Sequence, residues 1–215
     1  RRRGRVRRRT PVDRHAPPAG SKTEDLPVRG GAGRVQATLH RPPGLDGPEP
    51  TVVLLQGLAL RAADAPVPAM VAALLARGVQ ALAIDFEGFG DGAADPRYDR
   101  VFAPRRQRAE AVAVLRALHE GRAFPGAVDA TRLALWGYSY GGGHAIAVAA
   151  DAPRGVRAVA ARAPFVLGLP YVLRLLALDG RRLLRLAGRG LRDEAASWAG
   201  GAPRCVPLYG APAET

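Results

Sequence analysis

Ser139 is the residue whose surroundings point most directly to chemistry. It lies in the segment GYSYG, which has the pattern G-x-S-x-G, between an apolar run at 132–136 and a Gly/Ala-rich run at 142–150. The first run has the composition of a buried strand and the second predicts a helix. A serine on the sharp turn between a strand and a helix exposes its hydroxyl as a nucleophile. We therefore expect Ser139 to be a nucleophile, with Gly137 and Gly141 required because a side chain there would clash with the strand and the helix.

Two loops upstream of Ser139 follow strand-like runs of their own. The sequence QGL at 56–58 follows the apolar run 51–56, and DFEGFGD at 85–91 follows the run 79–85. Loops after parallel strands meet at one edge of a sheet, where sites are built. Because Asp85 precedes the serine, we interpret it as a residue that binds backbone amides in a tight turn and not as a catalytic acid.

The elements that must position these residues alternate along the chain. Apolar runs predict strands at 51–56, 79–85, 132–136 and 156–161, and helical patterns predict helices at 68–77, 106–120 and 142–150. The segment 34–40 alternates like a further strand, with 25–28 as its candidate partner. Strands that alternate with helices imply crossover connections and a mostly parallel sheet. The predicted fold class is α/β, a mostly parallel, doubly wound sheet with flanking helices.

A segment rich in leucine and arginine at about 165–200 predicts a helical insertion, interrupted at Asp179 and followed by a possible short helix at 191–199. One interpretation is a cationic helix that lies on a membrane surface. The favoured interpretation is a cap over the sheet, with its leucines packed inward and its arginines in solvent, since amphipathic helices are common in soluble domains.

Together these motifs resemble the α/β-hydrolase superfamily, and more narrowly bacterial dienelactone-hydrolase-like and Xaa-Pro-dipeptidyl-peptidase-like hydrolases. The resemblance covers about 25–215 and is strongest over 39–43, 51–58, 83–91 and 133–144; the segment 206–210 is also similar. It implies Ser139 as nucleophile and the backbone N–H groups of Leu58 and Tyr140 as the oxyanion hole. It further implies a small-molecule substrate with an ester, amide or related acyl bond, and no metal or organic cofactor.

The chain departs from this family's pattern in its catalytic histidine. The family order is serine, then an acid, then a histidine on loops after later strands. The one histidine after Ser139 is His144, which lies five residues along the same predicted helix, so its ring is expected to point away from the hydroxyl. We therefore expect the triad acid and histidine to be absent from this chain, as in a C-terminally truncated hydrolase. The alternative is a catalytically inactive relative that acts as a binding protein. Gln56, where a histidine usually precedes the glycine, does not remove a backbone oxyanion donor.

Charge and composition limit the other functions and locations expected of this chain. The net charge is +13, and residues 1–14 hold eight arginines and one aspartate. We expect a disordered tail at 1–24 and the hydrolase domain at 25–215. Such a tail binds phosphate backbones through charge alone, but no recognition motif accompanies it, so no specific nucleic-acid partner is expected. The chain has no run long enough to span a membrane and a single cysteine, Cys205, which permits a cytoplasmic location. The oligomeric state stays open.

Overall fold

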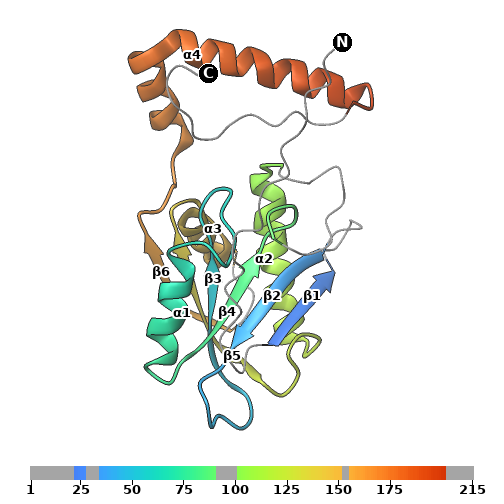
Figure 1. Ribbon diagram of the computed structural model, residues 1–215, viewed down its shortest axis with the longest axis vertical. Coiled ribbons are helices and arrows are strands. Elements are labelled where there is room, and N and C mark those ends of the chain that lie inside the picture. The colour runs from blue at the N-terminus through green and yellow to red at the C-terminus, as the bar shows by residue number, and fades with distance from the viewer. Residues whose placement is uncertain (1–21, 28–33, 91–100, 152–154, 202–215) are drawn as a thin grey trace, which may run out of the picture.

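A six-stranded sheet runs through the computed structural model of the chain (Figure 1), which describes residues 22–27, 34–90, 101–151 and 155–201. The strand order is β1-β2-β4-β3-β5-β6. The strands are β1 Lys22–Pro27, β2 Arg34–His40, β3 Glu49–Leu55, β4 Gln80–Asp85, β5 Val128–Tyr138 and β6 Val156–Arg162. The helices are α1 Val67–Leu75, α2 Pro104–His119, α3 Tyr140–Ala150 and α4 Gly168–Trp198.

Four neighbouring strands of this sheet, β4, β3, β5 and β6, are parallel. The strands β2 and β1 extend the sheet on the β4 side in antiparallel pairings. The parallel strands are joined through α1, α2 and α3, so their carboxyl ends lie at one edge of the sheet (Figure 1). The predicted α/β class with a mostly parallel sheet is therefore confirmed.

The two faces of the sheet bury separate apolar clusters. Val53 and Leu55 of β3 belong to the larger cluster, to which α2 and α3 contribute residues such as Val114 and Val148. Leu54 points to the opposite face and packs with Val67 and its neighbours on α1. Successive side chains of a strand alternate between faces, so a strand covered on both sides must be apolar throughout. This explains the continuous apolar runs that marked these strands in the sequence.

The amino-terminal hairpin begins slightly earlier than predicted. Asp25 lies opposite Gln36 in the antiparallel pairing of β1 with β2, as the pattern indicated, but the strand starts at Lys22, three positions before the expected domain boundary. The predicted tail up to residue 21, the hydrolase-like segment 206–210 and Cys205 lie outside the described residues.

The Leu/Arg-rich segment forms the long helix α4, with a break at Asp179, whose φ of −153° and ψ of 73° are not helical. The break falls where the sequence indicated it, but no separate helix forms at 191–199, because α4 continues to Trp198. The prediction that the leucines pack inward as a cap is wrong for the described residues. Leu169, Leu173, Leu176 and Leu184 are all exposed, and Figure 1 shows α4 apart from the helices that cover the sheet.

The strand β6 forms one edge of the sheet in the described part of the chain. Its only strand neighbour in the described part of the chain is β5. Most of its residues are exposed, and Val159 among them presents an apolar side chain to solvent. An edge strand with exposed apolar side chains is a place where another segment or molecule can add.

Candidate functional site

Ser139 occupies the junction between β5 and α3 and has a strained backbone. Its φ is 53° and its ψ is −113°. A positive φ is rare for a residue with a side chain and is found where the surrounding structure enforces it, often at functional sites. A strained turn between a strand and a helix is the geometry of a nucleophile elbow, in which the serine side chain points away from both elements.

The two glycines that flank Ser139 lie where the backbones of β3, β5 and α3 touch. A Cβ atom on Gly137 would lie 2.2 Å from the carbonyl oxygen of Gly141. A Cβ atom on Gly141 would lie 2.2 Å from the carbonyl oxygen of Leu55 and 2.3 Å from that of Gln56. Since these obstacles are backbone atoms, no rotamer change relieves them. The sharp turn at Ser139 therefore depends on glycine at both positions.

Hydrogen bonds tie the elbow to the end of β6. The Ser139 N–H donates to the carbonyl oxygen of Arg162 at 2.9 Å. The Ser139 carbonyl oxygen accepts from the N–H groups of Phe165 at 2.9 Å and Gly143 at 3.2 Å. The backbone of the serine is thus held by the helix that follows it and by the neighbouring strand. These bonds fix the position of the Cα atom that carries the hydroxyl side chain.

The N–H groups predicted as an oxyanion hole come from two elements beside the elbow. Tyr140 is the first residue of α3, and the first amides of a helix have no acceptor within it. Leu58 lies in the turn closed by the bond from the Leu60 N–H to the Gly57 carbonyl oxygen at 3.2 Å. That turn does not use the Leu58 amide. A Cβ atom on Gly57 would lie 3.3 Å from the Tyr138 ring, so this loop packs directly against the end of β5.

The Asp85 carboxylate fixes the loop that contains Leu58. Its Oδ1 atom accepts from the Ala62 N–H at 2.6 Å and lies 3.4 Å from the Gln56 Nε2 atom. A Cβ atom on Gly90 would lie 2.4 Å from the Asp85 Cβ atom, so the loop after β4 folds closely over this side chain. Asp85 therefore binds a backbone amide, as its sequence context suggested, and joins the loops that follow β3 and β4.

Aromatic side chains surround Tyr140, the residue after the serine. Its ring centroid lies 4.5 Å from that of Phe102, 4.4 Å from that of His144 and 6.4 Å from that of Phe165. Burial raises the pKa of the Tyr140 hydroxyl, and its oxygen is buried without a hydrogen-bond partner. Phe102 and Phe165 are partly exposed. An apolar, aromatic surface therefore adjoins the elbow.

His144 is the histidine nearest to this surface, and it has the environment of a core residue. It is buried against Phe86 and Tyr140. Burial, with a smaller contribution from the charge of Arg108, lowers its pKa from 6.5 to about 4. Its Nε2 atom has no hydrogen-bond partner. It is therefore neutral at pH 7 and makes no hydrogen bond to Ser139, which agrees with the orientation expected from the sequence.

The other two described histidines lie away from the elbow. His40 pairs with Ala81 at the start of β4, the edge opposite to the one where Ser139 follows β5. His119 ends α2, before the chain enters β5. Within the described residues, no histidine is hydrogen-bonded to Ser139.

A buried charge cluster that the sequence analysis missed lies under the loop after β4. Arg106 forms ion pairs with Glu87 and, at 3.3 Å, with Glu110, and a Glu110 carboxylate oxygen accepts from the Glu87 N–H at 3.1 Å. Burial raises the pKa of Glu110 to about 7, and the Glu87 charge adds to the shift, whereas the Glu87 N–H and Arg106 oppose it. The three residues are 19 and 4 positions apart in sequence, a spacing with no recognisable pattern.

Neither a metal-binding cluster nor a membrane-spanning helix is found in the described residues. The described residues contain no group of three or more His, Cys, Asp or Glu side chains that could hold a metal ion. In the same part of the chain, no helix is long and apolar enough to cross a bilayer.

Comparison with known proteins identifies the family. Residues 50–206 match the model of the alpha/beta hydrolase fold family. The quorum-quenching protein AidA of Acinetobacter baumannii (strain MDR-ZJ06) is 30% identical over 178 residues, which cover 81% of this chain and 54% of AidA. The chain belongs to the alpha/beta-hydrolase family, which confirms the superfamily resemblance noted in the sequence.

Solved structures agree on the fold. The α/β hydrolase GrgF of Penicillium sp. sh18 has a TM-score of 0.66 at 21% identity, over 88% of this chain and 59% of GrgF. A dienelactone hydrolase-like promiscuous phosphotriesterase from metagenomic libraries has a TM-score of 0.52 at 25% identity, over 68% of this chain and 60% of its own. The chain thus spans little more than half the length of the relatives it matches.

Proposed function

We propose that this protein is a serine-nucleophile hydrolase that cleaves ester, amide or related acyl bonds through an acyl-enzyme on Ser139. The observation that carries the proposal is the positive φ of 53° at Ser139, at a strand-to-helix turn where neither Gly137 nor Gly141 has room for a side chain. Strain of this kind often occurs at functional sites, and at a strand-to-helix turn with flanking glycines it presents a nucleophilic side chain. Membership of the alpha/beta-hydrolase family supports the same reaction class.

In the proposed reaction, the Ser139 Oγ atom forms a bond to the carbonyl carbon of the substrate and gives its proton to a base. The backbone N–H groups of Leu58 and Tyr140 donate to the oxyanion that develops. The tetrahedral intermediate then expels an alcohol or amine, which takes the proton from the base, and water hydrolyses the acyl-enzyme by the same two steps.

The base in this scheme comes from outside the described residues. His144 is unsuited to the role because burial lowers its pKa to about 4 and its ring lies against Tyr140 and Phe86. His40 and His119 lie on other parts of the sheet and helices. Asp85 is already bound to the Ala62 N–H.

The surroundings of the serine favour an apolar acyl group. Tyr140, Phe102 and Phe165 line the elbow with aromatic surface, which gains free energy by burying apolar substrate atoms. The relationship to a quorum-quenching protein adds cell–cell signalling molecules to the substrates worth assaying. We place the reaction in the cytoplasm, since a single cysteine is compatible with a reducing compartment.

Turnover of a series of p-nitrophenyl esters by the complete gene product tests this function. Ser139→Ala is expected to lower kcat by at least about 10³-fold, the scale seen when a catalytic serine is removed, whereas Ser197→Ala on α4 serves as the matched control and leaves turnover unchanged. Equal turnover by the wild type and by Ser139→Ala contradicts the proposal. Folded protein with no turnover of any acyl substrate favours the alternative, a relative that binds without catalysis.

A further inference from the structure

The helix α4 exposes more apolar surface than any other described element. Leu167, just before the helix, is 64% exposed, and Leu169 and Leu178 on its first arm are 66% and 71% exposed. On the second arm Leu184, Leu191 and Trp198 are 69%, 73% and 84% exposed. Soluble chains rarely expose a contiguous apolar surface of this kind unless it binds a partner or a membrane.

The first arm, before the break at Asp179, is apolar around its whole circumference. The segment 165–178 has the sequence FVLGLPYVLRLLAL and contains one charged residue, Arg174. A helix that is apolar on every side is stable when it is buried in a core or in lipid. The helical part of this arm spans 168–178, which is too short to cross a bilayer; apolar stretches of this length occur in buried core helices and at the membrane interface.

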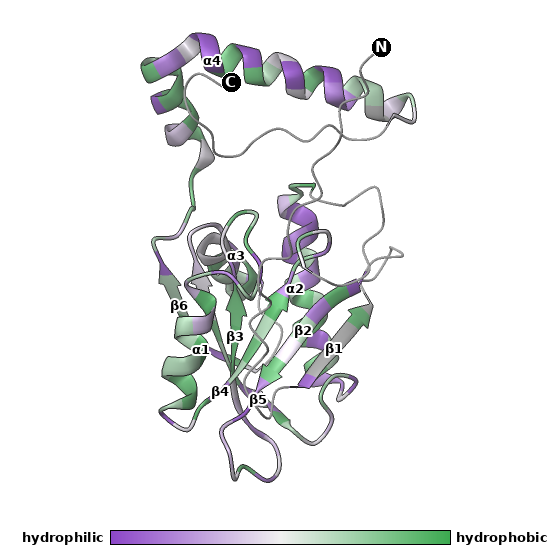
Figure 2. Ribbon diagram, viewed as in Figure 1, coloured by the Kyte–Doolittle hydropathy of each residue, from purple (hydrophilic) through white to green (hydrophobic). Residues whose placement is uncertain are grey.

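The second arm, after the break, gathers its arginines on one side, although Glu194 falls among the leucines on the other. At 3.6 residues per turn, all five arginines of this arm fall within an arc of about 100°; they are Arg181, Arg182, Arg185, Arg189 and Arg192. Leu183, Leu184 and Leu191 fall on the opposite half of the helix, with Trp198 among them. Asp193 and Glu194 leave this arm with a net charge of +3. Figure 2 shows the resulting alternation of hydrophilic and hydrophobic residues along α4.

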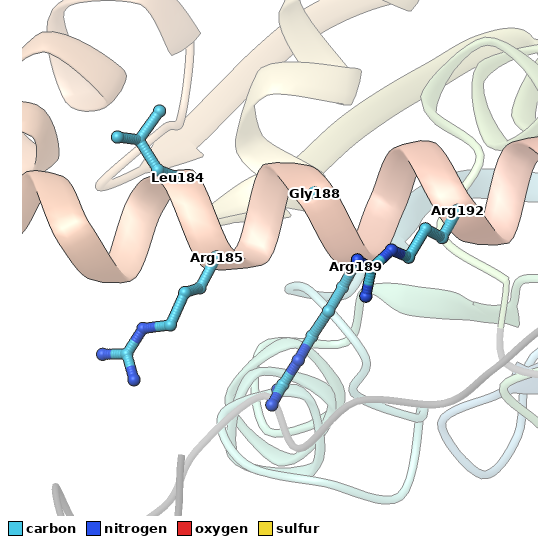
Figure 3. A pocket seen from close by; sticks show the side chains of 5 residues that line it. All are labelled: Leu184, Arg185, Gly188, Arg189 and Arg192. Carbon is cyan, nitrogen blue, oxygen red and sulfur yellow. The ribbon is translucent and has the colours of Figure 1, made fainter.

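The close view of this arm shows where its side chains point. An open recess along the helix is lined by Leu184, Arg185, Gly188, Arg189 and Arg192 (Figure 3). Within this set, the Leu184 side chain projects away from those of Arg185 and Arg189. A helix with arginines on its polar face and with leucine and tryptophan on the other has the composition of one that lies in the plane of a membrane surface.

We propose that α4 is an interfacial helix that binds anionic lipid bilayers. The leucines and Trp198 enter the boundary between headgroups and acyl chains, and the arginines pair with lipid phosphates. A second copy of the chain explains the surface less well, because one partner helix covers a single stripe, whereas the first arm is apolar on all sides. The arginines attract anionic lipids. Binding to an apolar groove on a protein would not require this positive charge. This proposal stands independently of the reaction at Ser139.

Binding to vesicles tests the proposal with the full chain. Vesicles of phosphatidylcholine with 30% phosphatidylglycerol should sediment with the protein, and pure phosphatidylcholine vesicles should bind far less. The substitution R185Q/R189Q/R192Q should weaken binding about 100-fold, from roughly a factor of five per arginine. The matched control R77Q/R105Q/R116Q removes the same charge from exposed positions near α1 and on α2 and should weaken binding much less.

A second readout distinguishes α4 from the arginine-rich first fourteen residues. Trp198 is exposed, whereas Trp136 is buried, so lipids brominated on their acyl chains should quench Trp198 alone. The expected result is quenching in the wild type and little in Trp198→Phe. Binding without quenching of Trp198 assigns the interaction to another segment and overturns the proposal. Absence of vesicle binding, or a stable dimer in solution whose Trp198 is shielded from lipid, overturns it as well. Ser139→Ala should bind vesicles as the wild type does.

Discussion

Replacing Gly141 with alanine tests the close packing that produces the elbow. In an unobstructed helix, Gly→Ala stabilises by about 1 kcal/mol. Here the new Cβ atom would lie 2.2 Å from the Leu55 carbonyl oxygen and 2.3 Å from that of Gln56. To reach an ordinary contact of ~3.5 Å, α3 and β3 would have to separate by about 1 Å. Overpacking of this kind costs about 1–3 kcal/mol or more, and both obstacles are rigid backbone.

We therefore expect Gly141→Ala to lower the free energy of unfolding by about 2 kcal/mol, equivalent to roughly 4–8 °C in Tm for a chain of this size. Urea unfolding followed by the fluorescence of Trp136, which is buried between β5 and α1, measures the loss. Gly188→Ala on α4 is the matched control, since its Cβ atom would meet nothing within 4 Å; it should not lower the free energy of unfolding. A Gly141→Ala variant as stable as the wild type within 0.5 kcal/mol would refute the steric account of the elbow.

Three further predictions concern buried polar groups. Asp85→Ala leaves the Ala62 N–H without its acceptor and should cost about 2 kcal/mol in urea unfolding, whereas Asp85→Asn should retain most of the stability; equal losses would mean that the carboxylate oxygen is not the essential group. Burial lowers the pKa of His144 from 6.5 to about 4, so the wild type should lose free energy of unfolding as the pH falls from 6.5 towards 4. His144→Phe should lose about 2 kcal/mol less than the wild type between pH 7.5 and pH 5. The pKa of Glu110, raised to about 7, has the opposite sign, because ionising it above its unfolded value of 4.5 costs folding free energy. Between pH 5 and pH 8, the free energy of unfolding of the wild type should therefore fall by about 2 kcal/mol relative to that of Glu110→Gln. A difference between the two proteins that does not change with pH would contradict the raised pKa.

The sheet and its helices could be predicted because each element is marked by residues close together in the sequence. The apolar run that became β3 is buried on both faces, and Gly78 ends the region of α1 with a φ of 72°, which glycine adopts readily. The turn at Ser139 was predicted from its flanking glycines for the same reason. These features depend on periodicity and on residues with special backbone freedom, both of which a sequence displays.

What the sequence could not predict depends on contacts between distant segments. Arg106, Glu87 and Glu110 meet only because α2 packs beside the loop that follows β4. The inward packing expected of α4 was wrong because amphipathicity shows that a helix has an apolar face and not what covers it. A catalytic base cannot be identified from sequence spacing either, because the folding of the chain decides which residue comes close to Ser139.

Covalent labelling of the complete gene product with a fluorophosphonate probe, followed by mass spectrometry of its peptides, identifies the nucleophile. We predict one adduct, on Ser139, and no adduct in a Ser139→Ala variant with the same folded structure. An adduct on another residue, or none in a folded protein that still turns over esters, would contradict the assignment of Ser139 as the nucleophile.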